Sequence, residues 1–365
     1  MSQIIVRSPT SRSNGTTDSI SSAIRFRGAD HPVNFSASPG PCSAGADPFL
    51  PLGLVTAMRT SRTLRLEAPV SAALHQGLDR IQTELLRGDP TLSRVLVSAP
   101  VRGPEAEARD RGNGAFFSGG VDSFYNLINR SEQISHLIFV GGFDIPLEDQ
   151  LRHRIALDLA KQVAMHFGKD LIHVTTDLRS FTNGRARWAQ HAHGPAMVGV
   201  AYLLRKQLRR VLIAGEYLGA TALAPASRVE LDPLWTTDEM EIQHVDHLVN
   251  RVAKLRRIAN LPVVQRCLRV CWEQRNSAIN CCECSKCLRN MAILHALGVL
   301  PRFSTFPKPL DLSRLSTLRL PVDRTCQYEA MSEALAIAGR DPGKRAFCSA
   351  LSACLRTNSR LVIEE

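Results

Sequence analysis

The sequence predicts an α/β protein with a doubly wound parallel sheet, and three observations support this fold class. From residue 111 onward, short apolar segments alternate with longer helix-like segments, as is typical of a parallel sheet with helices on both faces. The first apolar segment breaks into a Ser-Gly-Gly turn and runs directly into a helix-like stretch at residues 116–128. The 365 residues are 44% hydrophobic and 22% charged, which is ordinary for a globular protein large enough for two buried cores.

The first 110 residues predict two regions. Residues 1–22 are rich in Ser, Thr, Asn and Gly without an apolar period, so we expect a disordered tail. Residues 23–110 contain an apolar stretch, a helical pattern over 70–85 and two short strand-like segments. These patterns indicate a small α+β unit whose role the sequence leaves open.

The core domain is expected over residues 111–300, with a phosphate-binding loop near its start. Its predicted strands are 115–117, 137–140, 171–174 and 211–214, and its predicted helices are 121–130, 147–167 and 195–210. Ligands of such sheets bind beyond the carboxyl ends of the strands, so the loops there are the place to look for a site. Residues 301–365 show helical apolar spacing at Leu335, Phe347 and Leu351 and predict a helical C-terminal extension.

The loop at residues 118–123, Ser-Gly-Gly-Val-Asp-Ser, has the chemistry of a phosphate cradle. Glycines allow a tight turn that presents bare N–H groups, the following helix start adds its positive dipole end, and hydroxyls add further donors. The alternative is a Gly-Gly turn that binds nothing. The candidate phosphate-binding residues are Ser118, Gly119, Gly120, Val121, Asp122 and Ser123.

These six residues resemble the PP-loop of the ATP pyrophosphatase superfamily. The resemblance implies that the loop holds the pyrophosphate of Mg²⁺-bound ATP while an acceptor oxygen attacks the α-phosphorus, which gives an adenylated intermediate and free pyrophosphate. Asp122 and Ser123 are then the candidate catalytic residues, with Asp122 orienting either Mg²⁺ or the loop. The ordinary P-loop and the dinucleotide fingerprint do not occur in the sequence.

Loops after the other predicted strands supply the remaining nucleotide candidates. Gly142 and Asp144 follow the second strand, and Gly215 follows the fourth. We expect adenosine between the first two loops, with Asp144 as a ribose or magnesium partner. The alternative for each carboxylate is a helix cap or an exposed turn.

Five of the ten cysteines lie within residues 271–287, and four of them have the spacing of a metal site. Cys281, Cys284 and Cys287 form Cys-x-x-Cys-x-x-Cys, and Cys271 lies ten residues upstream. Four thiolates match a closed tetrahedral Zn²⁺ site. An iron–sulfur cluster, a redox pair and a loop with incidental cysteines are the alternatives, and the other nearby cysteines, at positions 267 and 282, are substitute ligands.

The cysteine spacing also resembles the zinc site of the 7-cyano-7-deazaguanine synthase family, in which an arginine follows the last cysteine. Here that arginine is Arg289, whereas Cys282 stands where this family usually has glycine. The resemblance spans roughly residues 113–298. It implies a structural zinc beside the acceptor pocket and supports the deazapurine substrate only weakly.

Together these features predict an ATP-dependent synthase. We expect adenylation of a carboxylate or carbonyl oxygen on a small-molecule acceptor, followed by attack of ammonia or an amine. The irregular stretch 225–238, with Arg228, Asp232 and the nearby His244, is the expected wall of the acceptor pocket. The alternatives are a tRNA sulfurtransferase with a persulfide or cluster on the cysteines, and a non-catalytic nucleotide-binding protein.

Charge and composition give the remaining expectations. The net charge of +11 and the pI near 9.5 would suit tRNA, nucleotides or an anionic membrane equally well, and the alternative is a solvated basic surface without such a partner. No apolar run approaches the roughly 20 residues of a membrane helix, and no secretory signal opens the chain, so a cytoplasmic location without a membrane partner is expected. We also expect an oligomer, of a size that the sequence leaves open.

Overall fold

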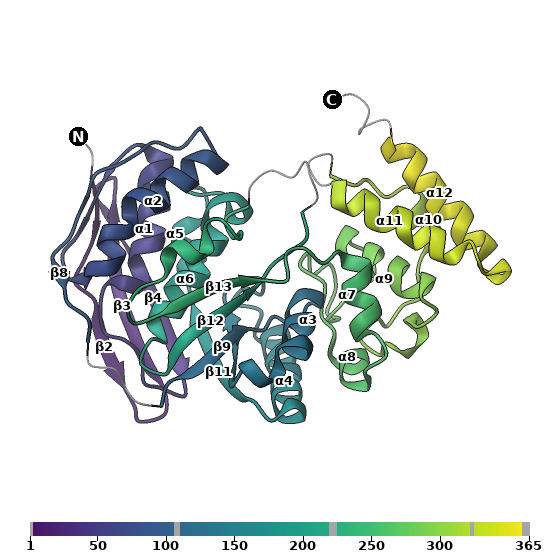
Figure 1. Cartoon of the computed structure of the whole chain (residues 1–365), viewed down its shortest axis with the longest axis horizontal. Coiled ribbons are helices and arrows are strands. Elements are labelled where there is room, and N and C mark those ends of the chain that lie inside the picture. Colours follow the sequence, from purple (N-terminus) through teal and green to yellow (C-terminus); the bar gives the residue numbers. More distant parts are fainter. Residues whose placement is uncertain (1–2, 106–109, 219–224, 322–324, 360–365) are drawn as a thin grey trace.

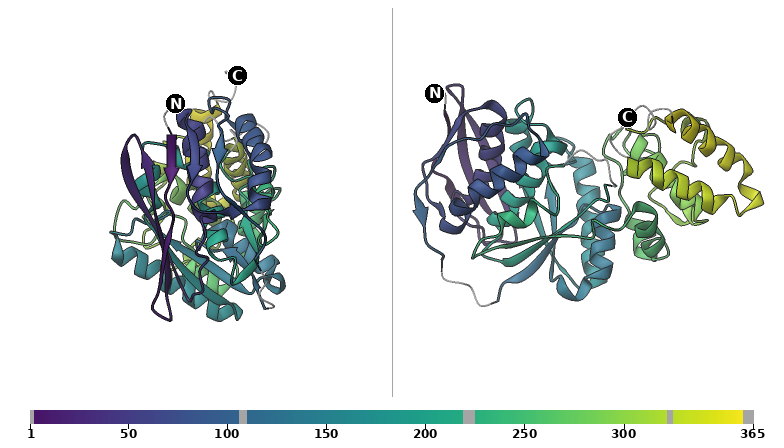
Figure 2. Two further views of the ribbon diagram at one scale, coloured as in Figure 1. Left: turned by 90° about the vertical axis from the view of Figure 1, so that its left-hand side faces the viewer. Right: turned by 45° about the horizontal axis from the view of Figure 1, so that its top comes forward.

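The computed structural model describes residues 3–105, 110–218, 225–321 and 325–359. An eleven-stranded sheet runs through the molecule, with helices on both faces (Figure 1). The N-terminal strands and the C-terminal helices lie at opposite ends of the molecule (Figure 2). The predicted α/β class with a mostly parallel central sheet is confirmed.

Five adjacent parallel strands form the part of the sheet that carries the candidate site. They are β9 (Gly112–Phe116), β10 (His136–Gly141), β11 (Asp170–Thr176), β12 (Leu208–Ala214) and β13 (Glu241–Val245). Their spatial order is β13-β12-β9-β10-β11. Strands β10 and β11 are added on one side of β9, and β12 and β13 are added on its other side. The loops after β9 and β12 therefore leave the sheet at a topological switch point.

The four predicted core strands are confirmed, each within a residue or a few of its predicted bounds, but two predictions in this region were wrong. The helix expected over 195–210 ends at Leu203, because residues from Leu208 onward are in β12. No strand was predicted after 211–214, yet residues 241–245 form β13. Only Ile242 of β13 is fully buried, so this edge strand lacks the continuous apolar run that marks a central parallel strand.

Helices cover both faces of the parallel strands. One face is covered by α3 (Val121–Asn129), α4 (Gln150–Phe167) and α7 (Arg251–Ile258). The opposite face is covered by α1 (Leu50–Thr60), α2 (Ala72–Gly88), α5 (Leu178–Thr182) and α6 (His193–Leu203). The crossovers from β9 to β10 and from β10 to β11 use one face, and the crossover from β11 back to β12 uses the other, so the parallel part of the sheet is doubly wound.

The expected disordered tail is wrong for the described residues of 1–22. They form β1 (Gln3–Val6), β2 (Thr10–Ser13) and the first part of β3 (Asp18–Phe26), while residues 1–2 lie outside the described chain. Every second residue of β3 from Ile20 to Phe26 is buried, which is the period of a strand. The predicted end of the tail at residue 22 fell in the middle of this pattern. Small polar residues on the other side of the strand hid that period.

The N-terminal unit does not form a separate sheet. Its strand β4 (Ala29–Ser38) pairs antiparallel with β11, with Phe35 opposite Thr176. The sheet then continues through β3 and β1 to β5 (Thr63–Leu66) and β7 (Val97–Ser98), and β2 pairs with β3. Two further short strands, β6 (Val70–Ser71) and β8 (Val101–Arg102), pair with each other.

The chain after β13 is helical, and its helices pack on the α3 side of the molecule. They are α8 (Pro262–Cys267), α9 (Ser285–Ala296), α10 (Leu312–Ser316), α11 (Thr325–Ala338) and α12 (Arg345–Ser359). Helix α11 packs against α9, α7 and α12. In the described part of the chain, helices thus follow residue 301 as predicted. None of the helices in the described ranges is long and apolar enough to cross a membrane.

Candidate functional site

The phosphate loop joins β9 to α3 in the conformation that its glycines predict. Gly119 has φ +75°, a left-handed conformation that favours glycine. Gly120 is the N-cap of α3 and offers no side chain to the first-turn N–H groups, which lack partners within the helix. The hydroxyl of Ser123 donates to Gly120 O at 3.0 Å, and Ser118 Oγ accepts from Gly120 N at 3.3 Å. Both hydroxyls therefore shape the turn.

Arg269 supports this loop from behind. Its backbone N–H donates to Gly119 O at 2.8 Å, and its Nε donates to Ser118 O at 3.0 Å. In a trans peptide the N–H points away from the C=O. Since the Ser118 carbonyl is turned toward Arg269, the Gly119 N–H is turned to the opposite side, where an anion could bind.

Asp122 lies between two cations from α7. Lys254 Nζ is 2.7 Å from Asp122 Oδ1, and Arg251 Nη2 is 3.0 Å from Oδ2. Lys254 is 1% exposed and also donates to Gly215 O at 2.6 Å. Burial alone would raise the pKa of Asp122, but the charges of Arg251 and Lys254 outweigh it and lower that pKa. The carboxylate is thus ionised and fixed at the switch point.

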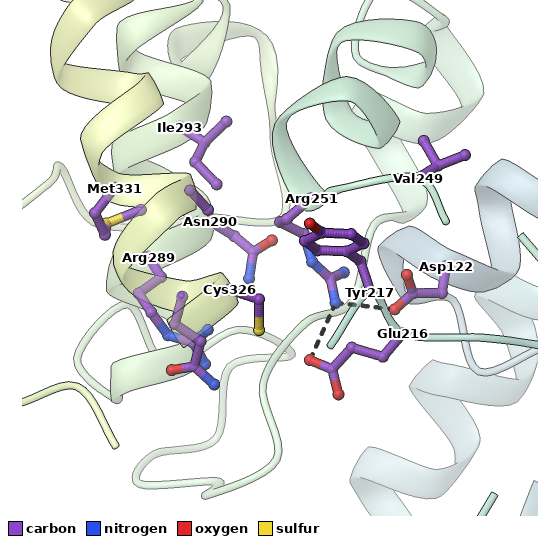
Figure 3. A pocket seen from close by; sticks show the side chains of 12 residues that line it. Asp122, Glu216, Tyr217, Val249, Arg251, Arg289, Asn290, Ile293, Cys326 and Met331 are labelled. Carbon is purple, nitrogen blue, oxygen red and sulfur yellow. Dashed lines mark ion pairs between the residues drawn. The ribbon is translucent and has the colours of Figure 1, made fainter. Parts of the chain in front are cut away.

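Arg251 also reaches a second carboxylate. Its Nη2 is 3.7 Å from Glu216 Oε1, so one guanidinium lies between Asp122 and Glu216 (Figure 3). Glu216 follows Gly215 in the loop after β12. The loops after β9 and β12 are therefore linked through two side chains of α7, Arg251 and Lys254.

The loop after β10 reaches the phosphate loop through Arg269. Gly142 has φ +92°, and a Cβ there would lie 1.9 Å from Thr176 O, so only glycine fits this turn. Arg269 Nη2 is 3.3 Å from Asp144 Oδ2. Burial would raise the pKa of Asp144, but the charges of Arg269 and Lys286 lower it. The structure thus brings Asp144 and Gly215 to the edge of the sheet that carries residues 118–123.

The four predicted metal ligands form one buried cluster. Their sulfur atoms all lie within 4.8 Å of one another, with 4.0 Å between Cys271 and Cys284 and 3.9 Å between Cys281 and Cys287. A tetrahedral Zn²⁺ with Zn–S bonds of about 2.3 Å needs sulfur atoms roughly 3.8 Å apart. The cluster therefore has the dimensions to hold a metal ion such as zinc.

Backbone N–H groups around the cluster suit thiolates rather than thiols. Cys281 Sγ accepts from the N–H groups of Glu283 at 3.4 Å and Cys284 at 3.3 Å, and Cys271 Sγ accepts from Gln274 N at 3.4 Å. Such donors stabilise the negative charge of ligating sulfurs.

The two substitute ligands lie outside the cluster. Cys282 has φ +62°, and its Sγ is 3.6 Å from Asn280 O. Cys267 Sγ is 4.0 Å from Gln162 Oε1. The positive φ at position 282 gives a physical reason why glycine suits this position.

The cysteine cluster is connected to the loop after β10 through Gln274. Its Nε2 donates to Asp144 O at 2.7 Å, and its Oε1 accepts from Arg152 Nη1 of α4 at 2.6 Å. On the other side, Cys284 is the N-cap of α9. A bound metal would therefore fix both the segment behind the phosphate loop and the start of α9.

A pocket opens beside Asp122, between the loop after β12 and helices α7, α9 and α11 (Figure 3). About 410 Å³ of non-atom space lies between its lining residues, and this volume includes open solvent. Asn290 and Gln327 are among the lining residues, and each has a buried side-chain oxygen without a hydrogen-bond partner. The residues that line it are Asp122, Glu216, Tyr217, Val249, Arg251, Arg289, Asn290, Ile293, Cys326, Gln327, Ala330 and Met331.

The structure does not place the expected acceptor wall, 225–238, at this pocket. Arg228 donates to Glu84 O at 2.6 Å and pairs with its carboxylate at 3.1 Å. Asp232 is fully buried, and its Oδ2 is 2.8 Å from His244 Nδ1. This stretch packs mainly as part of the core on the α6 side, with Trp235 fully buried, while His244 lies against Gly215, where a Cβ would be 2.4 Å from its Nε2.

Three site residues escaped sequence analysis, namely Arg251, Lys254 and Arg269. The first two are three residues apart on α7, after the N-cap Asn250, and so share a helix face. That signal becomes visible only once β13 is recognised as the strand before the helix. Arg269 stands two residues before Cys271, and only its contact with the phosphate loop reveals its role.

Comparisons of the chain with protein-family models, with curated proteins and with solved structures found no match. The interpretation of the site therefore depends on the residues and geometry of this chain.

Proposed function

We propose that this protein is an ATP pyrophosphatase of the PP-loop type, which adenylates a small-molecule acceptor. The observation that carries the proposal is the phosphate loop at the switch point, with unpartnered N–H groups at the start of α3 and the fixed carboxylate of Asp122 beside them. A helix start of this kind binds phosphate, and the carboxylate is suited to orient a hydrated Mg²⁺.

In the proposed complex, the β- and γ-phosphates of ATP bind to residues 118–123. Adenosine extends toward the turn at Gly142, where glycine allows close approach of the backbone, and Asp144 lies near the ribose. Lys286 contributes positive charge, since its ammonium group lowers the pKa of both Asp122 and Asp144. Bound Mg²⁺ would offset the negative charge that develops on the departing pyrophosphate.

The proposed reaction begins when a carboxylate or carbonyl oxygen of the acceptor attacks the α-phosphorus. A new P–O bond forms, the bond from the α-phosphorus to the bridging oxygen breaks, and pyrophosphate leaves with the electron pair. Arg251, held between two carboxylates 3.0 and 3.7 Å away, is placed to stabilise the added negative charge. Ammonia or an amine then displaces AMP from the activated acceptor.

We propose Zn²⁺ as the metal of the cysteine cluster, in a structural role. The four thiolates fill a tetrahedral coordination shell and leave no position for substrate. All four cysteines are 3% exposed or less, which disfavours a persulfide carrier that must reach tRNA. This burial supports the synthase over the sulfurtransferase alternative.

The proposal is tested by calorimetry with Mg-ATP and a non-hydrolysable analogue, together with a pyrophosphate-release screen across carboxylic acids, nucleobases and RNA. We expect binding by the wild type and loss of both binding and release in Asp122→Ala. Asp158→Ala is the matched control, because Asp158 is an exposed carboxylate on α4 that pairs only with Lys161 among the described residues. Absence of any heat with Mg-ATP, or unchanged turnover in Asp122→Ala, would overturn the assignment.

A further inference from the structure

Three arginine side chains gather around one phenylalanine at the turn between β3 and β4. The guanidinium carbons of Arg27, Arg62 and Arg185 lie 5.3, 5.1 and 5.2 Å from the ring centre of Phe26. His31 joins them, because Arg185 Nη2 is 3.1 Å from its Nε2. Arg27 is exposed, and the other two arginines and His31 are half-buried. These four basic residues, which we call the Phe26 cluster, form a patch that solvent reaches.

The positive charges of the Phe26 cluster have no counterion in the part of the chain that the structure describes. None of its three arginines forms an ion pair with a carboxylate there. By contrast Arg25, the residue before Phe26, pairs with Asp30 at 2.8 Å. Burial and the charge of Arg27 lower the pKa of Arg185. The cluster therefore gathers cations that repel one another, and an anion bound between them would remove this repulsion.

Two of the arginines are held in place by their surroundings. Arg185 Nη1 donates to Phe181 O at 2.7 Å, and its guanidinium carbon lies 5.1 Å from the Phe181 ring centre. Arg27 has φ +52° and Gly28 has φ +86°, at the two central positions of the turn. Such a turn prefers Asn-Gly, and an arginine in the left-handed region is uncommon. Arg27 thus occupies a position that the backbone alone would give to another residue.

Three guanidinium groups suit a phosphate monoester better than they suit other anions. Arginine presents a planar fork of donors to phosphate or carboxylate oxygens. A phosphate monoester carries a charge of about −1.5 to −2 and three terminal oxygens, so each arginine finds an acceptor. A carboxylate has one charge and two oxygens. RNA has one charge per phosphate along its strand, and cations spaced along a track would match it better than cations around one ring.

The Phe26 cluster is separate from the phosphate loop. Strand β4 pairs antiparallel with β11, so the turn before β4 lies at the edge where the parallel strands end. Helix α5, which precedes Arg185, packs on β4 (Figure 1). In the sheet, β4 and β3 are the third and fourth strands from β9. With neighbouring strands about 4.8 Å apart, the cluster is roughly 15–20 Å from residues 118–123.

We infer that the Phe26 cluster is a second anion site, which binds the phosphate group of a small phosphomonoester. The phosphate oxygens accept from Arg27, Arg62 and Arg185. The site joins the N-terminal unit, whose role the sequence leaves open, to the segment after α5. The inference does not depend on adenylation at the phosphate loop.

The experiment measures binding to the full-length chain by calorimetry, without Mg²⁺ or ATP. The probes are phenyl phosphate, its diester methyl phenyl phosphate, and benzoate. We expect the wild type to bind phenyl phosphate and to bind the other two at least about tenfold more weakly. Arg27→Asn and Arg62→Gln should each lower the affinity for phenyl phosphate about tenfold, since a hydrogen bond to a charged group is worth at least this factor. Asparagine suits the turn, so Arg27→Asn should fold.

Arg25→Gln is the matched control. It removes one positive charge from the same hairpin, but Arg25 points to the other side of β3 from Phe26 and pairs with Asp30. Its affinity for phenyl phosphate should equal that of the wild type. Mg-ATP binding should be unchanged in all three variants, and thermal unfolding checks that each is folded.

The site is rejected if phenyl phosphate does not bind, or if Arg27→Asn and Arg62→Gln bind it as tightly as the wild type. An equal loss in Arg25→Gln would assign the binding to net charge alone. Tighter binding of an oligoribonucleotide without terminal phosphate, with the same arginine dependence, would replace the monoester by RNA. A chain that binds phenyl phosphate as expected but gives no heat with Mg-ATP would keep this site and lose the proposed adenylation.

Discussion

The buried charges of the N-terminal half and those around the phosphate loop differ in how completely they are paired. At the junction with the N-terminal unit, both carboxylate oxygens of Glu239 are fully occupied: Oε1 by Arg102 and Glu105 N, and Oε2 by Arg102 and Arg205, all at 2.7–2.8 Å. Around the phosphate loop, Asp122 keeps a 25% exposed side chain, and two amide oxygens have no partner. Folding alone satisfies both oxygens of the Glu239 carboxylate, although Arg102 Nε beside it has no partner, whereas the residues around Asp122 border a pocket.

This contrast separates structural polar groups from ligand-binding ones within a single chain. Arg228, which the sequence suggested as a carboxylate clamp, belongs to the first kind because Glu84 occupies it. Arg251 is also an arginine beside carboxylates, but its guanidinium lies between two of them, Asp122 and Glu216, and both line the pocket. The lesson is that the pairing of a buried arginine, rather than its presence in a loop or helix, indicates whether a ligand can use it.

The largest expected effect comes from a substitution in the cysteine cluster, which lies near the phosphate loop. Cys281→Ser should lose the bound metal and with it the order of residues 267–287, because structural metal binding provides free energy of folding. Since Arg269 supports the phosphate loop from this segment, Mg-ATP binding should fall by more than tenfold. Metal analysis, calorimetry with Mg-ATP and denaturant unfolding measure these losses.

Cys282→Ser is the matched control for that variant. It alters the neighbouring buried cysteine, whose sulfur lies near Asn280 O rather than in the cluster. One metal ion per chain and normal Mg-ATP binding are expected. Loss of metal in Cys282→Ser, or its retention in Cys281→Ser, would mean that the ligand set is wrong.

The next largest effect is expected from a substitution in the network of Glu239, Arg102 and Arg205. Glu239→Gln removes the charge that faces Arg102 and Arg205, which keep Asp47 and Glu105 as partners, and the loss of these charged hydrogen bonds costs about 1.5–3 kcal/mol. We expect that loss in the free energy of unfolding by denaturant, with Mg-ATP affinity unchanged in the protein that remains folded. Asp30→Ala is the comparison variant. It removes an exposed partner of Arg25, and such a surface pair contributes less than about 1 kcal/mol.

The same network predicts part of the pH dependence of stability. Burial would raise the pKa of Glu239, but hydrogen bonds from Arg102 and the Glu105 N–H outweigh it and lower that pKa from 4.5 to about 2. A lowered folded-state pKa means stability that is complete above pH 4.5 and is lost as the pH falls toward 2. The unfolding free energy of the wild type should therefore decline more steeply than that of Glu239→Gln over this range. Parallel declines would show that folding does not lower the pKa of Glu239.

The sequence predicted the parts of the site that lie in one contiguous segment better than the residues that contact them from distant segments. The loop at 118–123 and the cysteine cluster are specified by contiguous residues, so spacing alone located them. Residues brought together by the fold were missed: Lys254 meets Asp122 from 132 positions away, and Arg269 meets Ser118 from 151 positions away. Such contacts depend on the strand order, which no local pattern encodes.

The same limit explains the errors in the N-terminal half. The period of β3 was hidden by serines within the strand, and β13 carries few apolar residues because it lies at the edge of the sheet. Both strands are stabilised by pairing with distant partners rather than by their own composition, as is common for strands. The expected acceptor wall does not line the pocket beside Asp122, since its apolar residues serve the core.

The smallest expected effect tests whether every orphaned polar group near the loop serves a ligand. Asn126 of α3 is fully buried, and both of its amide atoms lack partners, but it does not line the pocket beside Asp122. Asn126→Leu should therefore stabilise the protein by about 1–2 kcal/mol, since it removes two unsatisfied atoms at similar volume. Thr56→Val, which removes a single orphaned hydroxyl in the other half, should give a smaller gain. Denaturant midpoints measure both changes. If Asn126→Leu destabilised the chain or weakened Mg-ATP binding, Asn126 would have to be counted with the residues around Asp122, and the ligand-binding region would extend beneath the phosphate loop.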